Sequence, residues 1–169
     1  MVGHDERTHR YFEENTPTYS LARYAEVVDF LREDAGPTAG LLDVGCGSGE
    51  VLKLVADNTP IDDIAGVDVS AAYLERCAAL LPCKTYLGSI LDSDLAAIIG
   101  RRFRYVLVGA VLHHLVGESR EESADFARLG LQNAWALVDA GGGLILMEPT
   151  FRPRWLTARP FTSSGLSAE

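Results

Sequence analysis

Cysteine is scarce in this sequence, and long apolar runs are absent. The chain has three cysteines, Cys46, Cys77 and Cys83, an odd number without the paired spacing of a metal site. We therefore expect no metal site and no disulfide framework, and we expect a reduced, cytoplasmic setting. The longest apolar stretches, Tyr105–Leu112 and Leu144–Met147, fall far short of the roughly 18 to 20 residues that cross a bilayer, so no membrane segment is predicted.

Basic residues are also few. Fifteen Lys and Arg stand against 24 Asp and Glu, which gives a net charge of −9. A broad basic surface for nucleic-acid phosphates is therefore not expected, and the balance favours a small-molecule partner. The first seven residues are polar and mixed in charge, so they do not predict a secretory signal. With 47% hydrophobic and 23% charged residues over 169 positions, the composition suits one globular domain.

The segment Leu41–Glu50 is the most informative stretch of the chain. A short apolar run contains an acid, Asp43, and is followed by Gly45, Gly47 and Gly49 and then by a helical pattern. Glycine tolerates positive φ and lets a ligand approach the backbone, so this spacing indicates close ligand contact. The helix N-terminus behind the glycines favours a carboxylate or phosphate. A glycine-rich turn without a ligand is the simpler alternative.

The glycine spacing disfavours two common nucleotide loops. A dinucleotide fingerprint, G-x-G-x-x-G, starting at Gly45 needs a third glycine where Glu50 stands. A phosphate loop needs Gly-Lys-Ser or Gly-Lys-Thr, and neither follows. A nicotinamide-dependent oxidoreductase therefore stays as a disfavoured alternative.

A second acid follows the next predicted strand. The run Ile64–Val67 ends in Asp68, roughly twenty residues after the loop, where parallel nucleotide-binding folds place a ribose-binding carboxylate. A carboxylate suits this role because its two oxygens accept from two adjacent hydroxyls and its charge strengthens each bond. An exposed acid or a helix cap is the alternative interpretation.

Helical patterns alternate with five short apolar runs along the chain. The predicted strands start near Gly40 and then cover Ile64–Val67, Lys84–Leu87, Phe103–Val108 and Leu144–Met147. The predicted helices cover Thr8–Asn15, Leu21–Leu31, Val51–Val55, Leu74–Leu81 and, behind a capping box at Ser119, Phe126–Val138, which Gly141–Gly143 would end. This alternation predicts an α/β fold with helices on both faces of a mainly parallel sheet of strand order 3-2-1-4-5.

The Asp-x-Gly-x-Gly-x-Gly pattern from Asp43 to Gly49 resembles the first motif of class I S-adenosylmethionine-dependent methyltransferases. The likeness continues, motif by motif, from Tyr11 to Pro149. It implies a Rossmann-like three-layer αβα sandwich with S-adenosyl-L-methionine as cofactor and S-adenosyl-L-homocysteine as product. The implied reaction is in-line methyl transfer to an unidentified, small-molecule acceptor.

The resemblance also implies which residues hold the cofactor. The glycine loop would hold the methionine portion, Asp43 would support the loop or the amino group, and Asp68 would take the ribose. The full implied set is Tyr11, Tyr19, Asp43, Gly45, Cys46, Gly47, Gly49, Asp68, Val69, Ser89, Ile90, Gly109 and Ala110. The chain departs from the common pattern at Ser89, where many relatives carry an aspartate that binds the adenine amino group more strongly than a neutral hydroxyl does.

Two adjacent histidines follow the fourth predicted strand. His113 and His114 are the only histidines beyond the first ten residues. An imidazole beside the pocket accepts a proton near neutral pH, which makes both residues candidate catalytic bases. A helix cap or a pocket wall is the alternative role.

The likeness divides the chain into an N-terminal helical segment or lid (1–37), a cofactor-binding core (38–149) and an irregular tail (150–169). Family members usually add two further strands, and the tail is too short to form them. We therefore expect the C-terminal antiparallel strand pair to be missing, and a truncated domain that methylates poorly alone. Self-association or a partner is expected at the exposed edge of Leu144–Met147. A non-catalytic or partner-dependent cofactor-binding protein and an RNA methyltransferase stay as alternatives.

Overall fold

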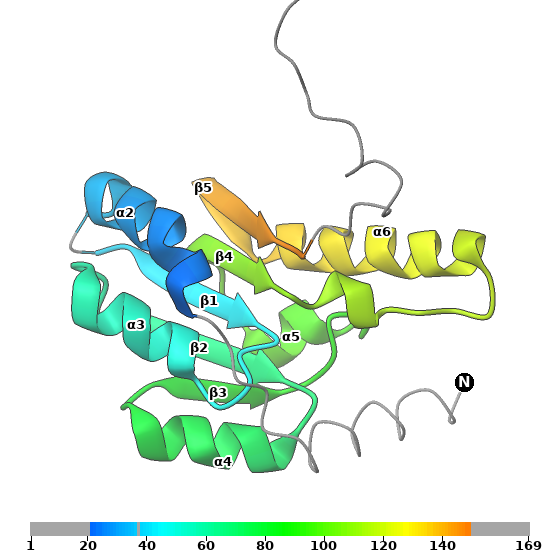
Figure 1. Cartoon of the computed structure of the whole chain (residues 1–169), viewed down its shortest axis with the longest axis horizontal. Coiled ribbons are helices and arrows are strands. Elements are labelled where there is room, and N and C mark those ends of the chain that lie inside the picture. Colours follow the sequence, from blue (N-terminus) through cyan, green and yellow to red (C-terminus); the bar gives the residue numbers. More distant parts are fainter. Residues whose placement is uncertain (1–20, 37, 150–169) are drawn as a thin grey trace, which may run out of the picture.

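A five-stranded parallel sheet forms the centre of the protein (Figure 1). The computed structural model describes residues 21–36 and 38–149. The strands are β1 (Gly40–Val44), β2 (Asp63–Asp68), β3 (Lys84–Leu87), β4 (Phe103–Gly109) and β5 (Val138–Met147). Their order, β3-β2-β1-β4-β5, with every neighbouring pair parallel, confirms the predicted fold class and topology.

Helices connect the strands and cover both faces of the sheet. They are η1 (Leu21–Tyr24), α2 (Ala25–Asp34), α3 (Glu50–Asn58), α4 (Ala71–Leu80), α5 (Leu95–Ile99), η2 (Leu112–His114) and α6 (Arg120–Ala136). α2, α3 and α4 pack on one face, and α5 and α6 pack on the other (Figure 1). The predicted three-layer sandwich is confirmed.

The central strand shows why both faces need covering. All five residues of β1 are buried, because their side chains alternate between the two faces of the sheet. Leu41 joins the apolar cluster under α2, α3 and α4, and Leu42 joins the cluster under α5 and α6. Neither side chain is exposed at all. This buried strand fixes the position of the loop that follows it.

Two serines begin helices as their residue type predicts. Ser70 Oγ accepts a hydrogen bond from Tyr73 N, and Ser119 Oγ accepts one from Glu122 N. The capping box is only half formed, because the Glu122 carboxylate accepts from Glu118 N instead of returning to the cap residue. Both helices therefore start directly after a serine, and the start after Ser119 is the one that the sequence analysis predicted.

The last helix ends, and the last strand begins, earlier in the sequence than predicted. The expected helix through Val138 ends at Ala136, and β5 begins at Val138, which pairs with Phe103. Phe103 N donates to Leu137 O at 2.9 Å, so the chain pairs with β4 before it reaches the glycines. Gly141, with φ +75°, lies inside the strand and accommodates the register shift between β4 and β5. The prediction that Gly141–Gly143 end the helix is wrong.

Two further expectations differ from the structure. The short helix α5 had no sequence prediction, because five residues show too little periodicity. Leu129, an apolar residue of the predicted helix Phe126–Val138, is 39% exposed on α6 instead of being buried in the core. Tyr11, Tyr19, the helix expected over Thr8–Asn15 and the tail 150–169 lie outside the described residues.

The described part of the chain contains no helix long and apolar enough to cross a bilayer. Within residues 21–36 and 38–149, no group of three His, Cys, Asp or Glu side chains is arranged to hold a metal ion.

Candidate functional site

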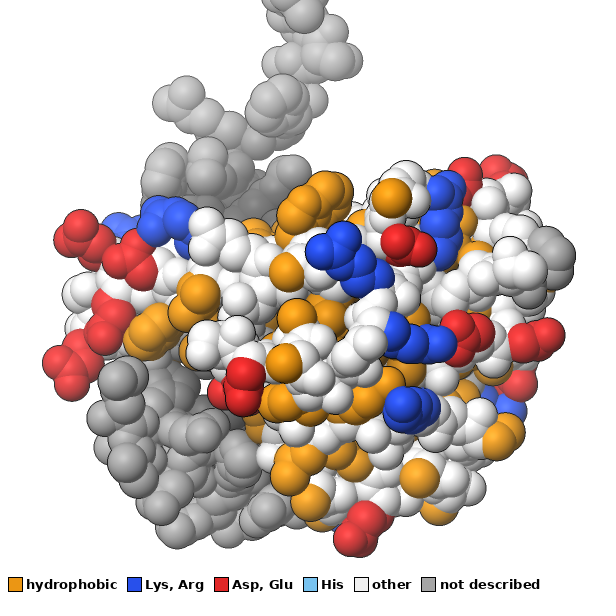
Figure 2. Space-filling view, turned by 180° about the vertical axis from the view of Figure 1, so that it is seen from behind, with side chains coloured by type: hydrophobic (Ala, Val, Ile, Leu, Met, Phe, Trp, Pro, Cys, Tyr) orange, Lys and Arg blue, Asp and Glu red, His pale blue; other side chains and the backbone are white. Residues whose placement is uncertain are grey.

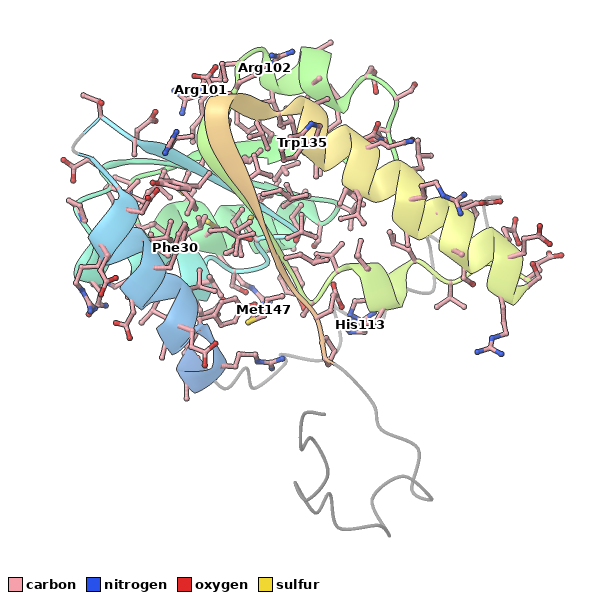
Figure 3. The ribbon with its side chains drawn as sticks, turned by 90° about the horizontal axis from the view of Figure 1, so that it is seen from above. Phe30, Arg101, Arg102, His113, Trp135 and Met147 are labelled. Atoms are coloured by element: carbon pink, nitrogen blue, oxygen red, sulfur yellow. The ribbon has the colours of Figure 1, made fainter. Side chains whose placement is uncertain are left out.

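The candidate site lies where the carboxyl ends of the strands meet. Because all five strands are parallel, their C-terminal loops share one edge of the sheet. The strand order reverses between β1 and β4, and such a switch point is where open α/β sheets bind ligands. His113 and Met147 lie at this end of the molecule, whereas Arg101, Arg102 and Trp135 lie at the other (Figure 3).

The glycine loop after β1 has an unusual backbone. Gly45, Gly47 and Gly49 have φ values of +79°, +53° and +88°, a region that side chains other than glycine rarely adopt. Gly45 N and Cys46 N both donate to Val67 O, at 2.8 and 3.1 Å. The loop is therefore tied directly to the end of β2.

The three glycines differ in what a side chain would meet. A Cβ at Gly45 would lie 2.4 Å from Val111 Cγ2, and one at Gly49 would lie 2.6 Å from Cys77 Sγ. A Cβ at Gly47 would meet no described atom within 4 Å. Two glycines are therefore required by packing, while Gly47 faces open space at the edge where a ligand would bind.

Asp68 at the end of β2 anchors the glycine loop. Its Oδ2 accepts from Gly47 N and its Oδ1 accepts from Ser70 N, each at 2.9 Å. The side chain is thus both a loop anchor and a turn former, which the sequence did not predict. Val69, between Asp68 and Ser70, is half-buried.

Asp43 is the unusual charge of the site. It is only 3% exposed, on the central strand, and no described residue donates a hydrogen bond to its carboxylate. Burial raises the pKa of Asp43 to about 8, and the nearby Asp68 and Cys77 act in the same direction. A positive group close to these two carboxylates would offset both the burial and the repulsion.

The loop after β3 is a compact turn. Ser89 N donates to Asp92 Oδ2 at 2.7 Å, and Ser89 Oγ accepts from Leu91 N at 3.1 Å. Ile90 is buried, and its carbonyl accepts from Asn133 Nδ2 of α6 at 2.8 Å. Asp92 and Asn133, which hold this turn in place, had no part in the sequence prediction.

The loop after β4 begins with the predicted small residues. A Cβ at Gly109 would lie 2.6 Å from the Tyr24 hydroxyl, so this glycine lets η1 approach the sheet. Ala110 has a φ of +58°, the only positive value among the described residues other than glycine. Ala110 N donates to Met147 O at 2.7 Å, which ties the loop to the end of β5. Strain of this kind is concentrated at functional sites.

Glu148 organises the rest of this loop. Its Oε1 accepts from Val111 N at 2.7 Å and from Leu112 N at 2.6 Å, and its Oε2 lies 2.8 Å from His113 Nδ1. One carboxylate therefore satisfies the N-terminus of η2 and orients the first histidine. The sequence signal was an acid directly after a predicted strand, but its partners are about 36 residues away in the chain.

The two histidines lie against each other at this point. The ring centroids of His113 and His114 are 3.9 Å apart, and η2 carries both. Burial lowers the pKa of His114, and the neighbouring His113 adds to that effect while Glu148 opposes it. His114 is therefore biased toward the neutral form that accepts a proton.

Two hollows of the described surface lie away from these residues. One of about 310 Å³ lies between α2 and α3, and one of about 240 Å³ lies between α3 and α4. Neither is lined by the residues of the glycine loop or by the histidines. The acids, the positive-φ backbone and the histidines converge at the strand ends, which makes this edge the candidate site.

The sequence matches a known family over this region. The model of the methyltransferase domain family matches residues 42–144, which include the glycine loop, Asp68 and both histidines. Ribosomal RNA small subunit methyltransferase C of Cronobacter sakazakii is 27% identical over 113 residues, covering 67% of this chain and 32% of that protein. The chain thus spans about a third of the length of this curated relative.

Solved structures resemble the fold. CalS10, an amino pentose methyltransferase from Micromonospora echinaspora solved with S-adenosylmethionine, is 25% identical with a TM-score of 0.61, covering 86% of this chain and 56% of that one. The N-methyltransferase NodS from Bradyrhizobium japonicum, solved with S-adenosyl-L-homocysteine, has a TM-score of 0.64, covering 82% of this chain and 71% of that one. At 18% identity, the second likeness concerns the fold alone.

Proposed function

This chain belongs to the methyltransferase domain family, and from that premise we propose that it binds S-adenosyl-L-methionine at the carboxyl edge of the sheet and transfers the methyl group to a small-molecule acceptor. The observation that carries the proposal is the pair of carboxylates, Asp43 and Asp68, beside a glycine loop of positive φ.

The charge of the site supports this cofactor. S-adenosyl-L-methionine has a positive amino group and a positive sulfur, and Asp43 and Asp68 repel each other in a buried setting. A bound ammonium would lower the pKa of Asp43, because its positive charge favours the ionised carboxylate that burial and the charge of Asp68 now disfavour. NAD carries a negative pyrophosphate instead, which two buried acids would disfavour.

Each segment of the edge then has a role. Gly45, Cys46, Gly47 and Gly49 would hold the methionine portion, since Gly47 leaves open space at its Cα. The Asp68 carboxylate, next to Val69, would take the ribose hydroxyls, because its charge strengthens each bond from a hydroxyl donor. The other proposed contacts are the adenine site at Ser89 and Ile90, the methyl side at Gly109 and Ala110, and two residues outside the described part of the chain, Tyr11 and Tyr19.

The chemistry asks little of the protein beyond alignment. The cofactor supplies a methyl group already activated by its positive sulfur, so the side chains contribute by orienting the acceptor and excluding water. With Nδ1 donating to Glu148, Nε2 of His113 would carry the lone pair that accepts a proton from the acceptor. His114, biased toward its neutral form, is the second candidate base.

An amino sugar is the acceptor class that the comparisons support first. CalS10 is described as an amino pentose methyltransferase. The alternative acceptor is RNA, which the name of the relative from Cronobacter sakazakii favours. The net charge of −9 disfavours RNA, and on the face seen in Figure 2 the Lys and Arg side chains stand singly among apolar and acidic ones.

Calorimetry with S-adenosyl-L-homocysteine and with NAD tests the cofactor. We expect the first ligand alone to bind, and Asp68→Asn to weaken that binding by about 1.5 to 3 kcal/mol for each charged hydrogen bond lost. Asp63→Asn is the matched control, because Asp63 lies at the opposite end of β2 and its side chain is 52% exposed. Equal affinity of the Asp68 variant and the wild type would remove Asp68 from the site.

A methyl-transfer screen tests the acceptor and the enzymatic activity together. Amino sugars and ribosomal RNA fragments would be offered with labelled cofactor. Transfer to sugars alone supports the proposal, and transfer to RNA alone replaces it with the second candidate. A chain that binds the cofactor and methylates neither would agree with the alternative of a non-catalytic or partner-dependent protein.

The outer edge of β5 is the proposed contact with a second copy of the chain. Among the described residues β5 pairs only with β4, and its ten residues include neither Pro nor Lys, which natural edge strands use to block pairing. Leu146 is 48% exposed there. Light scattering across a dilution series should show association, and Leu146→Lys should abolish it. Leu80→Lys, at a leucine 41% exposed on α4, is the control, and a monomer at every concentration would reject the contact.

A further inference from the structure

The three cysteines lie together at the glycine loop, although Cys46 is more than thirty residues before the other two in the chain. Cys46 belongs to the loop, Cys77 lies in α4 and Cys83 directly precedes β3. All three are free thiols. The sulfurs of Cys77 and Cys83 are 3.6 Å apart, and the Cys46 thiol donates to Gly47 O at 3.7 Å.

Cys77 supports the loop from below. A Cβ at Gly49 would lie 2.6 Å from its sulfur and 3.2 Å from its Cα, so the loop packs directly on this residue. Cys77 is fully buried, whereas Cys83 is only half-buried. The pair therefore has one member under the loop and one member that reagents in solvent reach.

The charge of the cluster favours thiol chemistry. The hydrogen bond from Cys46 lowers the pKa of Cys77 to about 7, and one from Cys83 acts in the same direction against the effect of burial. Burial raises the pKa of Cys83 to about 12. The thiolate of the pair is therefore on Cys77, which can accept the Cys83 proton across their contact while the accessible Cys83 sulfur reacts.

We propose that Cys77 and Cys83 form an oxidisable pair, and that a disulfide between them, made by a peroxide, loosens the glycine loop. As the Cys83 sulfur attacks one peroxide oxygen, its proton passes to the Cys77 thiolate and the O–O bond breaks. The hydroxide released takes a proton from solvent to become water, which leaves a sulfenic acid on Cys83. Cys77 then attacks the sulfenic sulfur, and the hydroxyl leaves as a second water. One peroxide is thus reduced to two waters while two thiols are oxidised to one disulfide.

The geometry gives the consequence for the loop. A disulfide needs the two sulfurs at about 2.05 Å, so they must approach from the present 3.6 Å. The Cys77 sulfur then leaves its place beneath Gly49. The loop loses a packing contact, and its amides should exchange faster. Weaker cofactor binding follows as well, and this last step rests on the proposed function.

The chain offers a direct way to map the bond. Trypsin cleaves after Arg76 and Lys84, so one peptide, Cys77–Lys84, contains both cysteines. After hydrogen peroxide, this peptide should lose two hydrogen atoms and resist alkylation, and dithiothreitol should reverse the change. A bond to Cys46 would instead join two peptides, and that result, or no disulfide at all, overturns the proposal.

The effect on the loop is measured on the same samples. Amide exchange in the peptide over the glycine loop should rise on oxidation, and the Kd for S-adenosyl-L-homocysteine should rise about fivefold to tenfold. Cys83→Ser is the control, because it removes the accessible sulfur and should leave both readouts insensitive to peroxide. A disulfide with unchanged exchange overturns the coupling. Failure of the reduced protein to bind the ligand counts against the proposed function, while the exchange measurement still decides the claim about the loop.

Discussion

The two halves of the carboxyl edge are built in different ways. After β1, the loop takes its shape from backbone conformation, with Gly45, Gly47 and Gly49 at φ between +53° and +88°. After β4, the loop takes its shape from one distant side chain, since Glu148 binds Val111 N, Leu112 N and His113 Nδ1. The first half is local in sequence, and the second depends on a contact between two strand ends.

Asp43 in the first half and Glu148 in the second differ in the hydrogen bonds that their carboxylates accept. Asp43 is buried without a hydrogen bond from any described residue, and its pKa is raised to about 8. Glu148 accepts from two backbone N–H groups and faces a histidine. A buried acid that accepts no hydrogen bond from the described residues has a cost that a cationic ligand relieves, while an acid that accepts several hydrogen bonds holds structure. The difference assigns ligand binding to the first half and positioning of the histidines to the second.

Gly45→Val should have the largest effect, because Gly45 is where the two halves touch. The new Cβ would lie 2.4 Å from Val111 Cγ2 at a φ of +79°, which adds a clash to about 1 to 3 kcal/mol of backbone strain. We expect loss of cofactor binding by calorimetry and a lower melting temperature. Gly143→Ala is the control, since a Cβ there meets nothing within 4 Å. Wild-type affinity in a folded Gly45 variant would show that the loop conformation is not needed.

The sequence predicted the first half well, for a physical reason. Glycine permits the positive φ that Gly45, Gly47 and Gly49 adopt, and Asp68 was located by its place after an apolar run. What the sequence missed is the anchoring role of Asp68, whose partner Gly47 N is 21 residues away. Residue type gave the position of the carboxylate, but its hydrogen bonds depend on how two strand ends meet.

The second half could be predicted only in outline. His113 and His114 were found as candidates, but the role of Glu148 requires β4 and β5 in register, with Gly109 opposite Met147. The start of β5 was also misplaced, because Gly141 reads as a helix stop in sequence and serves as a strand irregularity in the fold. Tertiary pairing overrode local preference in both cases.

Asp43→Asn should change how stability depends on pH. The folded pKa of about 8 lies above the ordinary 3.8, so the folded state keeps its proton in a range where the unfolded chain has lost it. The contribution of Asp43 to stability is then greatest below pH 4, and it falls as pH rises to about 8. The variant should flatten this slope in denaturant titrations over that range. An unaltered slope would mean that Asp43 ionises normally and has no stored cost.

Glu148→Gln tests the second half without touching the first. The amide keeps the size but loses the charge that strengthens the bonds to Val111 N and Leu112 N, so we expect a loss of about 1.5 to 3 kcal/mol in the free energy of unfolding. Binding of S-adenosyl-L-homocysteine should change far less than in the Gly45 variant. Glu75→Gln, at an exposed position on α4, is the control. Loss of binding equal to that of Gly45→Val would show that the two halves form one unit.

His114→Gln should have the smallest effect on stability. Its effect on the pH dependence of stability should be opposite in sign to that of Asp43→Asn. Burial lowers the pKa of His114 below 6.5, so as pH falls the unfolded chain takes up this proton before the folded one does. The wild type therefore loses stability as pH drops below about 6.5, and solvent screening keeps the loss under about 1 kcal/mol. Denaturant titrations at pH values on both sides of that point should show a smaller drop for the variant, with Asp43→Asn titrated in parallel. A loss of stability equal to that of the wild type would mean that His114 titrates alike in the folded and unfolded chain. The loop after β4 would then lack a proton acceptor that is biased toward its neutral form.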